Sequence, residues 1–253
     1  MGKDGKGADL IVFATDHMIS LPPPLGQFER PIEKYKKIND NTIAMLSGNP
    51  LIFDDLLVDC RKSCGFDEIK KVIQKNMNSV KSDIIQKQLL DIFKMNYDYV
   101  KEVLRGPIPN PFIQGILDSL SKFNLNTGIL LIGFEGDNAQ IVEITETTMA
   151  DLRDINFGAI GTGAVQAINT LLFQRHSKDD SLPTTIYNVY KAKRNAEVSI
   201  GVGKETDVII LTKLGTTKID GGKIQILSKI YEDELSFGKT NKQLYELVQA
   251  LIK

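Results

Sequence analysis

The chain has 253 residues, of which 42% are hydrophobic and 25% charged, which is enough apolar material for one large globular domain or two small ones. Its formal net charge of −1 provides no excess of Lys and Arg for binding phosphates, so we expect no nucleic-acid partner. No apolar run approaches the roughly 20 residues that cross a bilayer, and the N-terminus lacks the apolar core of a signal peptide. We therefore expect a cytoplasmic protein without a membrane partner.

The N-terminal segment is predicted to be a meander of strands. Residues 9–15 are almost continuously apolar, as expected of a strand covered on both faces. Residues 21–26 contain three consecutive prolines and are therefore predicted to form a loop. Two further strands are predicted at residues 35–38 and 42–47, joined by a turn at residues 39–41.

Gly48 lies directly between the last of these strands and a predicted helix. Asn49 and Pro50 are typical of an N-cap and a first helical residue. At such a junction backbone N–H groups point toward an anion, and a developing oxyanion could be held there. The same pattern also occurs where a glycine merely turns the chain, and both interpretations remain open at this point.

From Pro50 to about Arg105 the apolar residues recur at helical spacing, which predicts two or three amphipathic helices. Pro107, Pro109 and Pro111 interrupt any helix there, and another helical turn or two is expected before the helical region ends near residue 124.

A second sheet is predicted in the C-terminal half. A hairpin is expected from residues 128–134 and 139–144, with residues 157–160 as a third strand. Two helices should follow, at residues 164–173 and from Leu182 onward. The remaining predicted elements are strands at 207–211, 217–219 and 223–227, with a turn at 220–222, and a short helix at 243–252. Strands followed by paired helices in both halves predict an α+β fold with two stacked sheets and helices outside each. This is a four-layer αββα sandwich in a single domain, residues 1–253.

The sequence offers little for a metal site. Cys60 and Cys64 are four residues apart and cannot alone form a four-ligand zinc site. His17 and His176 have no ligand-like neighbours in the sequence, so we assign neither a role. We expect neither a metal nor a cofactor.

Several segments together carry a resemblance. They are residues 3–5 and 13–16, 34–38 and 43–48, 130–134, 159–163, and 192–195 leading to 207–210. In their order and spacing they resemble the proteasome β-type subunits of the N-terminal nucleophile (Ntn) hydrolase superfamily. The long N-terminal helix and Tyr-Asp-Arg signature of the family's α-type subunits are absent, so the resemblance is to the β type.

In that family an N-terminal threonine, freed by processing, is the nucleophile and, through its α-amine, the proton acceptor. The resemblance implies that Asp16 and Lys34 match the aspartate and lysine beside the nucleophile. It implies that Gly48 matches the oxyanion donor. It also implies that Thr162 and Ser199 match two downstream positions, usually serine, that hydrogen-bond around the nucleophile.

Two departures from the family pattern affect the expected function. The position matching the downstream aspartate is Ala196, although Asn195 and Glu197 flank it. The family's nucleophile precedes the Lys-Asp-Gly turn by about eight residues, whereas the sequence as given begins two residues before Lys3. We therefore expect the first strand, which would carry the nucleophile, to be missing from this sequence.

Three hypotheses follow. The protein could be a threonine-type peptidase or amidohydrolase whose true N-terminus carries Thr, Ser or Cys. It could be a non-catalytic, structural β-like subunit that forms a ring with itself or with homologous subunits. It could also be an unrelated α+β binding module, with residues 21–25 as an interaction segment. A peptide or protein substrate is possible, and ring formation is expected only from the resemblance.

Overall fold

The computed structural model describes residues 1–20, 26–30, 33–63, 65–106, 111–237 and 248–250. The predicted loop at 21–26 and the candidate interaction segment at 21–25 therefore lie almost entirely outside the described residues. The fold is mixed α+β, with antiparallel sheets. No helix in the described part of the chain has the length and apolar character needed to cross a bilayer.

The first sheet has the strand order β1-β2-β10-β11. Its strands are β1 (Gly2–Lys3), β2 (Asp9–Asp16), β10 (Thr206–Thr212) and β11 (Gly215–Lys218), and all neighbours are antiparallel. The predicted strands at 9–15 and 207–211 are confirmed, and they pair with each other although almost 200 residues separate them.

The second sheet has the strand order β5-β6-β7-β8-β9. Its antiparallel strands are β5 (Tyr35–Asn39), β6 (Thr42–Ser47), β7 (Gly128–Glu135), β8 (Asn138–Ile144) and β9 (Met149–Asp151). A separate two-stranded sheet is formed by β3 (Met18–Ser20) and β4 (Gln27–Glu29). The hairpins predicted at residues 35–47 and 128–144 are confirmed, but they form one sheet because β6 pairs with β7, whereas the sequence pattern assigned the first to an N-terminal meander and the second to a separate sheet.

The third strand predicted at residues 157–160 is wrong. The strand beside β8 is instead β9, and a turn then leads the chain out of the ladder, because the Asn156 N–H donates to the Leu152 carbonyl and Asn156 has a φ of 70°. Of the apolar residues that follow, Phe157 is buried and Ile160 partly buried, and neither pairs in a sheet. Phe157 packs against Leu171 of α5 (Ala164–Phe173), and Ile160 packs against the core between the sheets.

The strand predicted at residues 223–227 is also wrong, because these residues belong to helix α7 (Gly221–Phe237). The Asp220 carboxylate accepts a hydrogen bond from the Lys223 N–H at 3.1 Å, and the Asp220 carbonyl accepts one from the Ile224 N–H. The predicted turn at 220–222 is thus a capped helix N-terminus rather than a hairpin. Of the helix predicted at 243–252, only residues 248–250 lie within the described chain, and they are helical.

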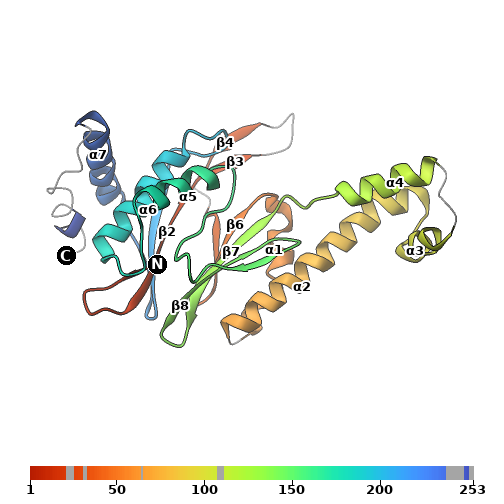
Figure 1. Cartoon of the computed structure of the whole chain (residues 1–253), viewed down its shortest axis with the longest axis horizontal. Coiled ribbons are helices and arrows are strands. Elements are labelled where there is room, and N and C mark those ends of the chain that lie inside the picture. The colour runs from red at the N-terminus through yellow and green to blue at the C-terminus, as the bar shows by residue number, and fades with distance from the viewer. Residues whose placement is uncertain (21–25, 31–32, 64, 107–110, 238–247, 251–253) are drawn as a thin grey trace.

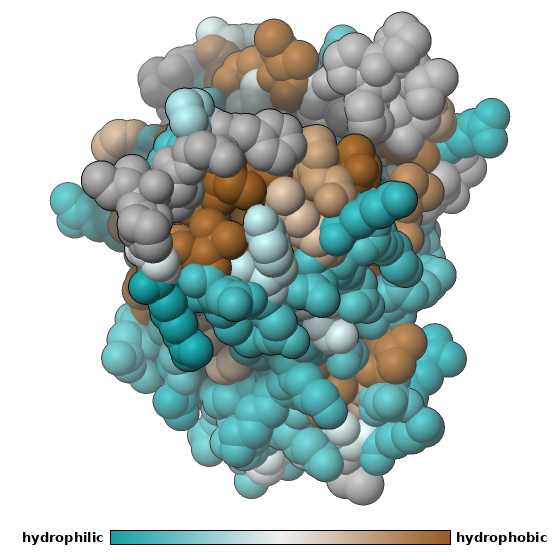
Figure 2. All heavy atoms as spheres, turned by 90° about the vertical axis from the view of Figure 1, so that its right-hand side faces the viewer, coloured by the Kyte–Doolittle hydropathy of each residue, from teal (hydrophilic) through white to brown (hydrophobic). Residues whose placement is uncertain are grey.

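The helices predicted between residue 50 and about residue 124 are confirmed, with more interruptions than expected. The elements are η1 (Pro50–Ile52), α1 (Phe53–Leu56), η2 (Cys60–Lys62), α2 (Phe66–Ile85), a π-helical segment η3 (Gln86–Leu90), η4 (Asp91–Phe93), α3 (Tyr97–Arg105) and α4 (Pro111–Lys122). The far part of α2 with α3 and α4 forms an arm that projects from the molecule (Figure 1). Seen from the side of the arm, the surface is mostly hydrophilic, with hydrophobic side chains gathered in its upper part (Figure 2).

The two sheets share a core. Phe13 and Ile209 of the first sheet pack with Ile132 of the second. Since side chains alternate along a strand, Val12 and Val208 point the other way, to α6 (Leu182–Ala196) and α7. The outer face of the second sheet packs on α1 and α2. Figure 1 shows α6 and α7 on one side of the sheets and α1 and α2 on the other.

Candidate functional site

A cavity of about 1400 Å³ lies among the two sheets, α6 and the segment at 157–164 that leads into α5 (Ala164–Phe173). Four of the five predicted site residues line it: Asp16, Lys34, Gly48 and Thr162. Ser199 does not. These four residues come from separate segments of the chain and line the same cavity.

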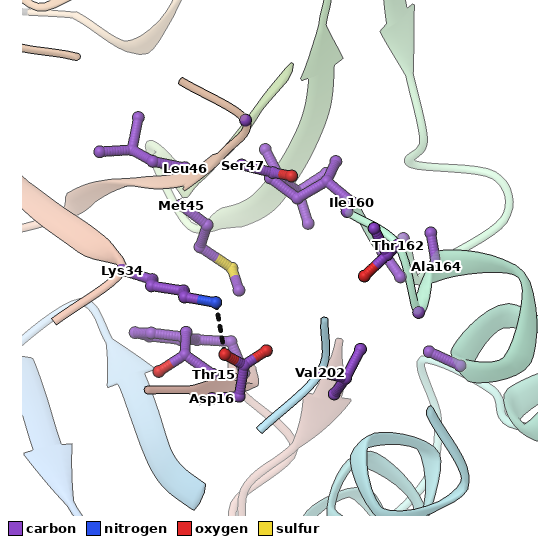
Figure 3. Close-up of a pocket in the computed structure, with 18 of the residues that line it drawn as sticks. Thr15, Asp16, Lys34, Met45, Leu46, Ser47, Ile160, Thr162, Ala164 and Val202 are labelled. Atoms are coloured by element: carbon purple, nitrogen blue, oxygen red, sulfur yellow. Dashed lines mark hydrogen bonds and ion pairs between the residues drawn. The ribbon is translucent and has the colours of Figure 1, made fainter. Parts of the chain in front are cut away.

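The centre of this group is an ion pair between Lys34 and Asp16. Asp16 ends β2, and its carboxylate also accepts a hydrogen bond from the Met18 N–H at 2.7 Å. Lys34 precedes β5, and its carbonyl accepts a hydrogen bond from Leu46 of β6 at 3.0 Å. Figure 3 shows the lysine ammonium turned toward Asp16, with Thr162 on the opposite wall of the cavity. The pair is three-quarters buried, so the ammonium is held where solvent screens it less than at a surface.

Gly48 has a structural reason to be glycine. Its φ is +105°, and a Cβ at this position would lie 1.9 Å from the Asn126 carbonyl oxygen. The turn is fastened further because the Asn49 N–H donates to the Thr127 hydroxyl at 3.3 Å. Asn49 also caps the helix as predicted, accepting from the Leu51 N–H at 3.1 Å. Close packing of backbones is therefore sufficient to require this glycine, and an oxyanion role would come in addition.

Thr162 lies in the loop that leads into α5. Both flanking glycines are closely packed: a Cβ on Gly161 would lie 3.1 Å from the Ser47 hydroxyl, and one on Gly163 would lie 2.8 Å from the Cβ of Ala196. These contacts hold the loop against β6 on one side and against the end of α6 on the other. Thr162 itself is exposed at the cavity.

Ser199 lies in the turn after α6, where its N–H donates to the Ala196 carbonyl at 3.0 Å. Its hydroxyl is buried and has no hydrogen-bond partner among the described residues. The carboxylate of Glu197, beside the position that matches the family's aspartate, is bound by Lys193 at 2.7 Å. Asn195, on the other side, is bound to Thr170 and Tyr231. The structure thus places neither flanking side chain at the Asp16–Lys34 pair.

Lys193 lines the cavity and was not selected from the sequence. Its ammonium donates to Glu197, to the Gly203 carbonyl at 2.8 Å and to the Lys204 carbonyl at 2.9 Å. Burial lowers the pKa of Lys193, although Glu197 acts in the opposite direction. All three ammonium hydrogens are used, so Lys193 fastens the loop at 203–204 to α6. Its only signal in the sequence is the i,i+4 spacing to Glu197.

Both histidines were left without a role by the sequence, and both are paired with carboxylates. His17 lies 3.1 Å from Asp207, and His176 lies 2.9 Å from Asp180. Within the described residues no three metal-binding side chains are grouped as a metal site would require. Cys60 is free and buried, and burial raises the pKa of its thiol to about 11. Cys64 lies outside the described residues.

No protein-family model matches this sequence, and no curated protein sequence gives a significant match. The interpretation of the cavity therefore depends on its geometry and on the resemblance of the segments around it.

Proposed function

We propose that the chain is a proteasome-like domain of the Ntn-hydrolase superfamily and that it acts as a threonine-type peptidase or amidohydrolase. Three separate cores support the corresponding four-layer αββα arrangement. One lies between the sheets, one between the first sheet and α6 and α7, and one between the second sheet and α1 and α2.

The observation that carries the proposal is the Asp16–Lys34 ion pair in the wall of the cavity. A lysine held by an aspartate can keep a neighbouring amine neutral and stabilise negative charge on a neighbouring oxygen. Gly48 and Thr162 line the same cavity, on two other parts of the chain. A lysine and aspartate paired on an open surface would have no such surroundings.

The register of β1 supports a specific position for a nucleophile upstream of Met1. Gly2 lies opposite Leu10 and Lys3 lies opposite Asp9. In the same antiparallel register, Met1 would lie opposite Ile11. If the chain continues upstream as the same strand, a residue about five positions before Met1 would lie opposite Asp16. A Thr, Ser or Cys there would have its side chain and α-amine beside Lys34.

Such a residue would act in the following way. Its hydroxyl or thiol would attack the amide carbonyl while its own α-amine accepts the proton, which forms a tetrahedral oxyanion. The N–H of Gly48 would donate to that oxyanion. The α-amine would then return the proton to the leaving amine, and water would hydrolyse the ester or thioester.

The test is a protein extended upstream and processed so that it starts with this residue. Turnover of a panel of fluorogenic peptide amides should be abolished by Lys34→Ala. Lys37→Ala is the matched control, because Lys37 lies three residues after Lys34, in β5, and pairs with Asp40 at 2.9 Å on the surface. Full activity in the Lys34→Ala protein would end this assignment.

A second candidate function is that of a non-catalytic structural subunit in a ring. It is favoured by Ala196, which occupies the position of the assisting aspartate, and by Ser199, which does not line the cavity. Native mass spectrometry distinguishes the candidates when it is combined with the turnover assay. A ring without turnover supports the structural role, and a strict monomer at micromolar concentration counts against both proteasome-like readings.

A further inference from the structure

A buried histidine connects β1 to the loop between α5 and α6. The imidazole of His176 has no exposed surface, and its Nε2 lies 3.0 Å from the Met1 carbonyl oxygen. Because a carbonyl oxygen only accepts hydrogen bonds, Nε2 must carry a proton and donate it. The other ring nitrogen, Nδ1, lies 3.4 Å from the side-chain amide of Asn188 in α6, which can donate to it, and 2.9 Å from the Asp180 carboxylate.

The same loop holds β1 at two further points. The Lys3 N–H donates to the Asp180 carbonyl at 2.8 Å, and Lys3 forms a parallel bridge with Ser181. A Cβ on Gly2 would lie 2.2 Å from the Thr185 hydroxyl, so the strand can approach α6 this closely only with glycine at that position. Asp180 is itself held, since it accepts from the Ser177 N–H at 3.1 Å.

These contacts matter because β1 pairs with β2 over Gly2 and Lys3 only. A ladder this short specifies register weakly, and a slip of one residue turns every side chain to the opposite face of the sheet. A slip in β1 would also move any residue upstream of Met1 by one position and turn its side chain to the opposite face. A contact with the Met1 carbonyl, at the upstream end of β1, limits the slip directly.

We propose that His176 is a positioning residue that fixes the Met1 carbonyl and thereby sets where the strand upstream of Met1 meets the Asp16–Lys34 pair. The catalytic half of this inference rests on the proposed function. The structural half, that His176 holds β1, does not.

Two substitutions separate the hydrogen bond from the volume of the ring. His176→Gln keeps an N–H donor at a position similar to Nε2, and His176→Met keeps an apolar side chain of similar length without a donor. Tyr231→Phe is the control, because it removes a hydrogen bond to Asn195 between α7 and α6, away from β1.

The first readout is hydrogen exchange of the Lys3 amide in the chain as printed, measured by NMR beside the amides of β10. We expect exchange of Lys3 to accelerate about tenfold or more in His176→Met, with β10 unchanged, and to stay within about twofold of the unsubstituted protein in His176→Gln and Tyr231→Phe. Unchanged exchange of Lys3 in His176→Met would overturn the inference, whatever the activity.

The second readout is turnover by the extended, processed protein. His176→Met should lower kcat about tenfold or more with KM within about twofold, and His176→Gln should restore most of kcat. A kcat of His176→Met equal to that of the unsubstituted protein would overturn the positioning role. An extended protein without turnover in its unsubstituted form would instead overturn the proposed function, while the exchange of Lys3 would still decide whether His176 holds β1.

Discussion

Asp9 of β2 accepts a hydrogen bond at 3.0 Å from the backbone N–H of Ala139 in β8, across the boundary between the two sheets. The same carboxylate binds the Lys3 ammonium at 2.5 Å. One side chain therefore joins β1, β2 and β8, and it does so at the end of β1 whose upstream continuation would lead to the candidate site.

We predict that Asp9→Asn destabilises the protein at neutral pH and much less in acid. Burial opposes ionisation of Asp9, but Lys3 and the Ala139 N–H outweigh it and hold the pKa of the carboxyl below its ordinary value of 3.8. A lowered carboxyl pKa gives stability that is present above about pH 4 and is lost as the pH falls through the lower, folded-state pKa. Urea unfolding of both proteins between pH 2 and pH 7 tests this. A difference between them that is independent of pH would contradict it.

Gly48→Ala should destabilise the protein by about 3 kcal/mol or more, because alanine would be strained at a φ of +105° and its Cβ would collide with the Asn126 carbonyl. Gly5→Ala is the control, since a Cβ there would meet nothing within 4 Å, and it should change stability by less than about 0.5 kcal/mol. Denaturant unfolding measures both. Similar stabilities for the two variants would show that the turn at Gly48 can relax.

Lys193→Met should cost about 3 kcal/mol, because it leaves the carbonyls of Gly203 and Lys204 without their donor and leaves the Glu197 carboxylate with only its longer contact to Arg194, at 3.3 Å. The exposed pair of Lys213 and Asp137 provides a contrast, and Lys213→Met should cost less than about 1 kcal/mol. Adding Glu197→Gln to Lys193→Met should recover part of the loss, since the largely buried carboxylate that has lost its Lys193 partner is then replaced by an uncharged amide. No recovery in the double variant would mean that the carbonyls, rather than the carboxylate, set the cost.

The core strands could be predicted from the sequence because their signal is local. Residues 10–14 and 128–134 are apolar without interruption, and such runs form strands when both faces are covered. The strand predicted at residues 223–227 shows the limit of this argument. Its apolar residues alternate as in a strand, but Ile224, Leu227 and Ile230 also follow helical spacing, and Asp220 supplies the cap. The helical pattern was present in the sequence and was the correct one.

The candidate site could be predicted only in part. The Asp16–Lys34 pair came from a resemblance between segments, and no periodicity in the chain would have indicated it. The contact between His176 and Met1 joins residues 175 positions apart, so it depends on the completed fold. Ser199 was assigned to the site only because its position in the sequence matches a family position. In the structure it lies in the turn after α6 and does not line the cavity.

The intact mass and N-terminal sequence of the protein isolated from its own host decide whether a nucleophile precedes Met1. We expect a mature N-terminus that is Thr, Ser or Cys, about five residues upstream of Met1, where the register of β1 leads to Asp16. A mature protein that begins at Met1 or Gly2 would contradict the catalytic proposal and leave the structural subunit as the better reading.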